Sequence, residues 1–373
     1  MRKGILIVTT LAMIIGFTNC KKGSVNLIYD RKYIKQIKES RKDIAFFLSR
    51  NNVPGASFAV AKNGKIIYSE GIGLASKDLD VPANRNTKFR IGEVSELFTS
   101  TIYQLMIEDG VLDPDSTIQH YIPDYPEAGG NITLKQLAYH TSGIRVEDET
   151  EENWLGLNVS IQKGIDRFKD QPPVNVPDLF QERSMFNYNL LGAIMEKASG
   201  KKFSDLLKEY ITDTLGFTNT TVDNPFQTIK GRTDFYDYNI ISQVIDAISR
   251  DLRYSAPSKG ILSNAEDLVK FGNAVFYTDF LPEKIKERLI EPVYLLDSFP
   301  APMANAWILL ESKGERIYGR KGTVTGGGAA ILVVPHEKLV VAGTINLTSK
   351  LDEIPVFEIA EHFISETEET DNN

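Results

Sequence analysis

The chain has 373 residues, of which 42% are hydrophobic and 25% are charged, and its formal net charge is −8. This composition indicates a globular protein, long enough for one large domain or two closely packed ones. The acidic excess gives no indication of a nucleic-acid partner, which needs a basic surface. One cysteine excludes an intramolecular disulfide, and four scattered histidines argue against a zinc site. We expect no metal and no cofactor.

The N-terminus resembles an export signal. Arg2 and Lys3 precede an apolar run over residues 4–17, and three residues later comes Cys20. The run is too short to cross a bilayer comfortably, which favours a signal peptide over a transmembrane helix.

Cys20 stands where a bacterial lipoprotein is cleaved and acylated, and the preceding residues resemble a lipobox. We therefore predict a lipoprotein signal peptide at 1–20 and a polar tether at 21–30. Several acyl chains would hold the protein durably in a membrane. This predicts an exported protein on the periplasmic or cell-surface side of the bacterial envelope. The alternative is cleavage by an ordinary signal peptidase, with an incidental cysteine.

The next segments alternate between helix and strand patterns. Apolar residues at helical spacing predict an amphipathic helix over 30–49. Two apolar strands, 57–61 and 65–69, flank Asn63-Gly64, which is a strong hairpin signal. A strand at 88–91 then leads into a helix that Gly110 ends.

Helical stretches separated by Pro- and Gly-bearing loops fill the middle of the chain, about 93–285. Strand patterns return at 307–310, 316–318, 329–334 and 339–345.

A last helix is predicted over 354–364, and an acidic tail without apolar residues over 366–373, where we expect disorder.

Strands at both ends of the chain and helices between them predict an α+β fold. The simplest arrangement is one antiparallel sheet built from both ends, flanked by the terminal helices, with an all-α insertion. The domain would cover 31–365, with an α/β part at about 31–92 and 286–365 and a helical part at about 93–285. A cleft is expected where the insertion meets the sheet.

Several segments, in this order and spacing, resemble the serine hydrolase family of class C β-lactamases, penicillin-binding D-Ala-D-Ala carboxypeptidases and related esterases. The segments that carry the resemblance are Val53-Pro54-Gly55-Ala56, Phe89-Arg90-Ile91-Gly92, His140-Thr141-Ser142-Gly143, Tyr188-Asn189-Leu190-Leu191-Gly192, Leu215-Gly216-Phe217 and Ala265-Glu266-Asp267-Leu268. The similarity runs from about Ile34 to Ile364 and implies the β-lactamase/DD-peptidase fold.

The resemblance also implies three catalytic motifs. A serine nucleophile and a lysine in S-x-x-K lie one turn apart at the start of a helix, so that both face the cleft. A tyrosine in Y-x-N assists proton transfer, and its asparagine holds the substrate amide. A H-x-G or K-T-G stretch on a strand binds the substrate's carboxylate or carbonyl.

All three motifs are altered in this chain. The serine and lysine positions carry Glu93 and Glu96, directly after Phe89-Arg90-Ile91-Gly92. The tyrosine and asparagine positions carry Arg183 and Met185.

In the third motif Arg320 replaces histidine, and only the final glycine, Gly322, is kept. Because every nucleophilic or proton-transferring position has changed, we expect no acyl-enzyme chemistry at these family-equivalent positions.

Other residues offer weaker candidates for catalysis. Ser95 lies close to the nucleophile position in sequence, but because each residue turns about 100° around a helix, we expect it to point away from the cleft. The S-x-x-K matches at Ser160 and Ser199 are no more than chance supplies. His140 belongs to a segment that is structural in the relatives.

Glu93 and Glu96 would form a new acid–base or metal-binding pair only if no cation lay nearby, because opposite charge lowers a carboxyl pKa and repels a metal. We predict instead that they form salt bridges with Arg183 and Arg320, since an unpaired buried ion is costly.

The sequence therefore favours an inactive, envelope-anchored pseudoenzyme with a binding or scaffolding role. Its partner would be an unidentified small molecule, peptide or protein, and the candidates for binding it are Arg183, Arg320, Lys321 and Thr323. The alternative is an active peptidase, esterase or β-lactamase-type hydrolase that uses a non-standard site.

Overall fold

The computed structural model describes residues 26–127, 131–152, 154–156, 159–312, 314–348 and 354–364. The strands are β1 (Leu27–Tyr29), β2 (Gly55–Lys62), β3 (Lys65–Ser76), β4 (Val81–Pro82), β5 (Phe89–Arg90), β6 (Thr221–Val222), β7 (Tyr236–Tyr238), β8 (Val244–Asp246), β9 (Ile261–Ser263), β10 (Met303–Ala304), β11 (Trp307–Ser312), β12 (Glu315–Val324), β13 (Gly327–Val334) and β14 (Leu339–Ile345). The α-helices are α1 (Ile34–Arg50), α2 (Ser95–Glu108), α3 (Ile118–Tyr121), α4 (Leu134–Ala138), α5 (Glu149–Glu152), α6 (Ile161–Ile165), α7 (Met185–Ser199), α8 (Phe203–Leu207), α9 (Asp213–Leu215), α10 (Ala265–Tyr277), α11 (Glu283–Ile290) and α12 (Val356–Glu361). Short 3-10 turns include η2 (Gly92–Val94) and η5 (Leu252–Ser255).

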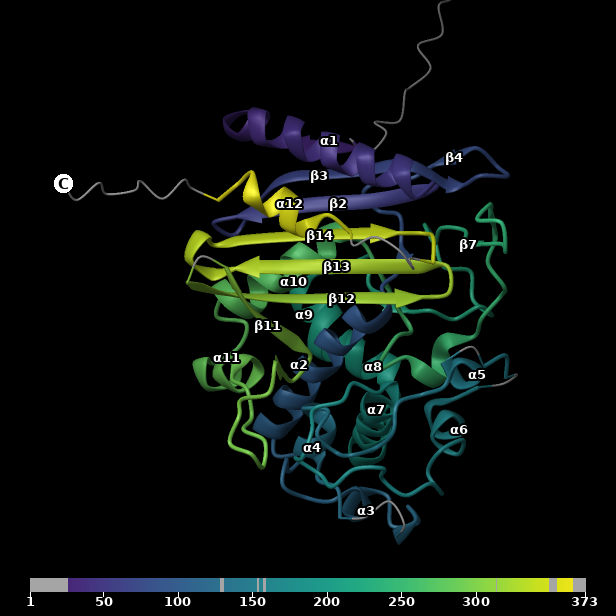
Figure 1. The fold of residues 1–373 in the computed structure, drawn as a ribbon, viewed down its shortest axis with the longest axis vertical. Coiled ribbons are helices and arrows are strands. Elements are labelled where there is room, and N and C mark those ends of the chain that lie inside the picture. The colour runs from purple at the N-terminus through teal and green to yellow at the C-terminus, as the bar shows by residue number, and fades with distance from the viewer. Residues whose placement is uncertain are drawn as a thin grey trace, which may run out of the picture.

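The main sheet joins the two ends of the chain, as the strand pattern predicts. Its order is β1-β3-β2-β14-β13-β12-β11-β10, and every neighbouring pair is antiparallel. The strands β2 and β14 pair over the whole of β14, with Ala59 opposite Ala342 (Figure 1). The predicted antiparallel sheet is therefore confirmed.

Successive side chains of these strands point to opposite faces, and each face is covered by helices. On one face, Ile44 of α1 and Ile359 of α12 pack in a core with Phe58 and Val341. On the other face, α10 lies so close that a side-chain carbon at Gly272 would meet Val340 at 2.8 Å. The helical part of the chain extends below this layer in Figure 1, with α3 at its far end.

Some boundaries differ from the sequence prediction. The segment predicted as a tether, 21–30, contains β1, which pairs with β3. The segment predicted as a helical insertion, 93–285, contains the helix α10 that covers the sheet and the short strands β6 to β9. These strands are two or three residues long, too short for an alternating pattern to show in the sequence.

The predicted signal peptide, Cys20 and the acidic tail lie outside the described residues. Among the helices that are described, none combines the length and the apolar character needed to cross a membrane.

Candidate functional site

The three altered motifs meet where the start of α2, the start of α7 and the middle of β12 come together. Two glycines allow this contact. A side-chain carbon at Gly92 would lie 2.5 Å from the amide nitrogen of Thr323, and one at Gly322 would lie 2.4 Å from the amide nitrogen of Glu93. Gly92 also has a φ of +53°, which favours glycine. Close backbone packing thus requires glycine at position 322.

Glu93 lies beside Arg183, whose side chain is partly exposed, and we call this end of the site its mouth. Three groups contact the Glu93 carboxylate. Its Oε1 lies 3.2 Å from Nη2 of Arg183 and 3.5 Å from Nζ of Lys259. Its Oε2 accepts the backbone N–H of Thr323 at 2.7 Å. Burial raises the pKa of Glu93, but Lys259, Arg183 and the Thr323 N–H outweigh it and leave the pKa below its ordinary value. Glu93 is therefore an anion at neutral pH.

The Thr323 N–H has chemical significance because of where it points. In acyl-transfer enzymes, backbone N–H groups aimed at the reacting carbonyl stabilise the oxyanion that forms. Here Thr323 directs such a group at the residue in the nucleophile position, and the Glu93 carboxylate accepts it. A substrate carbonyl would have to displace an anion that is already bound in this place.

Sequence reasoning missed two members of the cluster, Lys259 and Glu147. The Lys259 ammonium group lies between carboxylates, 3.5 Å from Glu93 and 3.2 Å from Glu147. Glu147 also accepts the backbone N–H of Met185 at 2.9 Å, at the positive end of the α7 dipole. The only signal in the sequence is that Lys259 is the one charged residue in a stretch of small residues, 255–260, before β9, and nothing local links it to the altered motifs.

Glu96 lies one turn further into α2 and pairs with Arg320 of β12. Both side chains are buried, with exposed fractions of 2% and 0%. The Arg320 Nε also donates to the backbone carbonyl of Glu93 at 3.2 Å. Burial lowers the pKa of Arg320 to about 10, against a raising effect of Glu93, so Arg320 stays cationic at neutral pH. The ion pairs predicted for Glu93 and Glu96 are both present.

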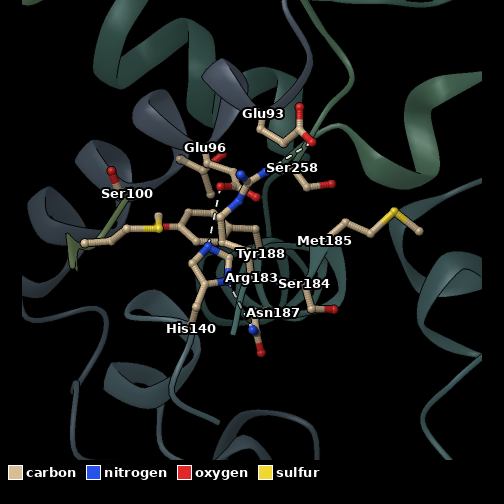
Figure 2. Close-up of polar contacts among 12 residues, drawn as sticks. Glu93, Glu96, Ser100, His140, Arg183, Ser184, Met185, Asn187, Tyr188 and Ser258 are labelled. Atoms are coloured by element: carbon tan, nitrogen blue, oxygen red, sulfur yellow. Dashed lines mark hydrogen bonds and ion pairs between the residues drawn. The ribbon is translucent and has the colours of Figure 1, made fainter. Parts of the chain in front are cut away.

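His140 lies below Glu96, as Figure 2 shows. Its Nδ1 faces the Asn187 side-chain amide at 3.1 Å and the Ser184 N–H at 3.4 Å. Ser142 donates to the Asn187 oxygen at 2.6 Å, which turns the Asn187 NH₂ toward the histidine. Nδ1 is therefore an acceptor, and the proton lies on Nε2, 3.5 Å from a Glu96 oxygen.

Burial, and then the charge of Arg183, lower the pKa of His140 to about 3. The ring is therefore neutral at physiological pH, and its Nε2 lies close to Glu96 without a hydrogen bond. Together the site holds three carboxylates and three cations, with a neutral histidine between them: the carboxylates are Glu93, Glu96 and Glu147, and the cations are Arg183, Lys259 and Arg320.

The hydroxyl groups around the cluster all have structural partners. Ser184 caps α7 and donates to the Arg145 carbonyl, and Ser258 donates to Asn189. Ser100 donates to the carbonyl of its own helix at Leu97.

Ser95 accepts the backbone N–H of Ile261 at 3.2 Å, so it points away from the cluster, as predicted. Ser160 and Ser199 sit at helix ends, at the start of α6 and the end of α7.

Tyr188 packs on His140 with ring centroids 4.9 Å apart, but its hydroxyl donates to the Ala138 carbonyl. Burial raises the pKa of Tyr188 well above its ordinary value, so it does not act as a base.

The four predicted ligand-binding residues are therefore not equivalent. Arg320 is buried against Glu96, and the Thr323 N–H is bound to Glu93. Lys321 is exposed on β12, and 38% of the Arg183 side chain is exposed at the mouth. Lys321 and Arg183 are thus exposed to solution, Thr323 is partly exposed, and Arg320 is buried.

Two relatives found by sequence comparison show what this chain is similar to. The chain is 26% identical to the human protein "Serine beta-lactamase-like protein LACTB, mitochondrial" over 408 residues, which covers 82% of this chain and 73% of that protein. It is 24% identical to "Protein flp" of Staphylococcus aureus (strain NCTC 8325 / PS 47) over 311 residues, covering 81% of this chain and 61% of that protein.

Solved structures show the same fold. The octameric penicillin-binding protein homologue from Pyrococcus abyssi superposes with a TM-score of 0.74 at 20% identity, covering 84% of this chain and 74% of that one. A class C beta-lactamase superposes with a TM-score of 0.72 at 19% identity, covering 90% and 98%. The Beta-lactamase family model matches residues 31–361, nearly all of the described domain. The chain belongs to the beta-lactamase family.

Proposed function

We propose that this chain is a catalytically inactive member of the family, anchored on the bacterial envelope, with a binding or scaffolding role. The observation that carries the proposal is that paired, charged side chains fill the positions predicted for the catalytic serine and lysine. Glu93 and Glu96 stand in the serine and lysine positions, and each is held by a cation. The lipid anchor at Cys20 rests on the sequence pattern alone.

The geometry supports inactivity on chemical grounds. Acyl transfer needs a nucleophile beside a base, and a donor open to the oxyanion. The lowered pKa of Glu93 makes it a poor general acid at neutral pH, and the Thr323 N–H is already taken. Removing the nucleophile or the base of a serine enzyme costs about 10⁶-fold in turnover, so any remaining rate of the family type is negligible.

A binding role would use the mouth of the site. The Arg183 guanidinium is partly exposed, and Lys321 is exposed on β12, one residue after Arg320. Guanidinium groups bind carboxylates by charge-assisted hydrogen bonds, so a carboxylate-bearing ligand such as a peptide C-terminus suits this surface.

Covalent labelling tests inactivity directly. We expect no labelling of the purified chain by a fluorescent penicillin or a fluorophosphonate, under conditions where an active penicillin-binding D-Ala-D-Ala carboxypeptidase is labelled by the penicillin. Stoichiometric labelling by either reagent would falsify the proposal. Mapping the modified residue would then identify the nucleophile.

Restoring the family residues at four positions is a second arm of this test. The substitutions are Glu93→Ser, Glu96→Lys, Arg183→Tyr and Met185→Asn. We expect this variant to remain unlabelled and to be less stable, because the new lysine, Lys259 and Arg320 would then face one carboxylate, Glu147. Labelling of this variant would show that the rest of the catalytic machinery is intact.

A further inference from the structure

The outward surface of the first helix is strongly basic, although the chain as a whole is acidic. Residues 31–50 carry seven cationic side chains, and all seven residues are exposed: Arg31, Lys32, Lys35, Lys38, Arg41, Lys42 and Arg50. We call this surface the basic face of α1. The opposite stripe of the helix, with Ile37, Ile44 and Phe47, is buried against the sheet. The fold therefore directs these charges into solvent on one side.

The carboxylates near the basic face neutralise only part of it, because two of its seven cations are paired with them. Glu39 pairs with Lys42 at 2.8 Å, and Glu70 pairs with Arg41 at 2.9 Å. Asp43 contacts His362 at 2.6 Å.

Within the part of the chain that the structure describes, Arg31, Lys35 and Lys38 take part in no ion pair. A net positive surface remains.

Apolar side chains stand among these cations. Phe46 is 66% exposed, and the guanidinium of Arg50 lies 6.0 Å from its ring centroid. Ile34, at the start of the helix, is also exposed. Cationic and apolar groups on one helix surface are typical of segments that lie on a membrane interface.

The N-terminal segment enters the fold beside this helix. Asn26 donates to the carbonyl of Gly71 and accepts the N–H of Arg85. Gly71 follows Glu70, the partner of Arg41 at the middle of α1. Six peptide units separate Asn26 from Cys20 and reach at most about 20 Å, which is shorter than the helix itself at about 25 Å. An acylated Cys20 would therefore keep the basic face close to the bilayer.

We propose that the basic face of α1 docks on the anionic surface of the membrane that holds the lipid anchor. This inference rests on the proposed envelope anchoring. Phosphate headgroups match the charge of the face, and the short tether supplies a high local concentration. Figure 1 shows α1 at the end of the molecule opposite α3, so docking by α1 directs the helical part away from the bilayer. A ligand would then approach from the aqueous phase.

Lysine footprinting on vesicles tests the docking. The full-length chain, produced in a bacterium and extracted from its membranes, is reconstituted in phosphatidylcholine alone or with about 30% phosphatidylglycerol. An acylating reagent is then added, and the rate at which it modifies each lysine is measured by mass spectrometry. We expect Lys32, Lys35 and Lys38 to react about threefold more slowly on the anionic vesicles, and this difference to vanish at about 0.5 M salt. Lys202, whose side chain is 77% exposed, serves as the internal control and should react equally on both.

Two matched charge reversals sharpen the experiment. Lys35→Glu, Lys38→Glu and Lys42→Glu together should remove the protection of Lys32. Reversing Lys201 and Lys208, on either side of α8, and Lys284 in α11 changes the net charge equally, keeps Lys202 as the internal control, and should leave the protection in place. The proposal is overturned if the lysines of the basic face react equally on both vesicle types, or if both triple variants lose the protection of Lys32 to the same extent. So does protection on both vesicle types that disappears when residues 366–373 are deleted, because the acidic tail would then be the occupant.

Whether Cys20 carries a lipid anchor is measured separately. The intact mass of the extracted chain shows whether Cys20 carries acyl chains. If it carries none, the envelope anchoring fails, and the footprint is measured with vesicles added to the soluble chain. Composition-dependent protection in that case still supports docking by α1.

Discussion

The altered site has two layers that satisfy their charges in different ways. In the inner layer, Glu96 and Arg320 form one buried pair against a neutral His140. In the outer layer, Glu93 shares Lys259 and Arg183 with its surroundings, and Arg183 is partly exposed. A buried charge with a single partner depends on that partner, whereas a charge with several partners keeps some of them when one is lost. The inner layer should therefore tolerate only paired changes, and the outer layer should tolerate single ones.

Breaking the inner pair should have the largest effect. Arg320→Met leaves Glu96 ionised and buried without a cation, so we expect the free energy of unfolding to fall by about 3–5 kcal/mol. Urea denaturation followed by circular dichroism measures this. The paired variant Glu96→Leu with Arg320→Met is the control and should recover most of the loss. A paired variant as unstable as the single one would contradict the two-layer description.

His140 gives the inner layer a pH dependence. Its pKa is about 3 in the folded protein and about 6.5 when unfolded, so between these values the unfolded chain binds one more proton. The contribution of His140 to the free energy of unfolding is therefore fully present above pH 6.5. As the pH falls below 6.5, this contribution decreases by about 1.4 kcal/mol per pH unit, which amounts to about 3 kcal/mol at pH 4.5.

Urea midpoints measured between pH 7.5 and 4.5 check this slope. His140→Gln should flatten it, because glutamine does not titrate. His362→Gln, at the partly exposed contact with Asp43, is the matched control and should keep it. An NMR titration showing His140 protonated at pH 5.5 would sink the prediction.

Lys259 tests the outer layer. Lys259→Met removes the cation shared by Glu93 and Glu147, but Arg183 and the Thr323 N–H still hold Glu93. We therefore expect a loss of about 1–3 kcal/mol, smaller than that of Arg320→Met. Combining Lys259→Met with Glu147→Gln should reduce the loss. A loss above that of Arg320→Met would reverse the order of the two layers.

The contrast between the layers also explains what the sequence could predict. The antiparallel sheet follows from alternating strands at both ends, and the family segments fix the positions of Glu93, Glu96, Arg183 and Arg320. Their ion pairs follow from the cost of burying charge. Lys259 lies 166 residues from Glu93 in sequence, outside any of the altered motifs, so no local pattern announces it.

His140 illustrates a different limit of sequence reasoning. The intact His140-Thr141-Ser142-Gly143 segment predicts a structural loop, and the Ser142–Asn187–His140 contacts have that character. Its approach to Glu96 depends on how two segments pack together, which the local sequence does not contain.

The smallest effect is expected at the rim, where solvent screens the charges. Arg183→Ala removes a contact of 3.2 Å to Glu93, but the Arg183 side chain is 38% exposed, so we expect a loss of at most about 1 kcal/mol. Because this pair lies near solvent, about 0.5 M salt should nearly abolish the difference from the parent chain, while the loss in Arg320→Met should persist. Arg183→Lys keeps the charge and should behave like the parent. An Arg183→Ala loss that is large and insensitive to salt would mean that the mouth is closed to water, and that the outer layer is as buried as the inner one.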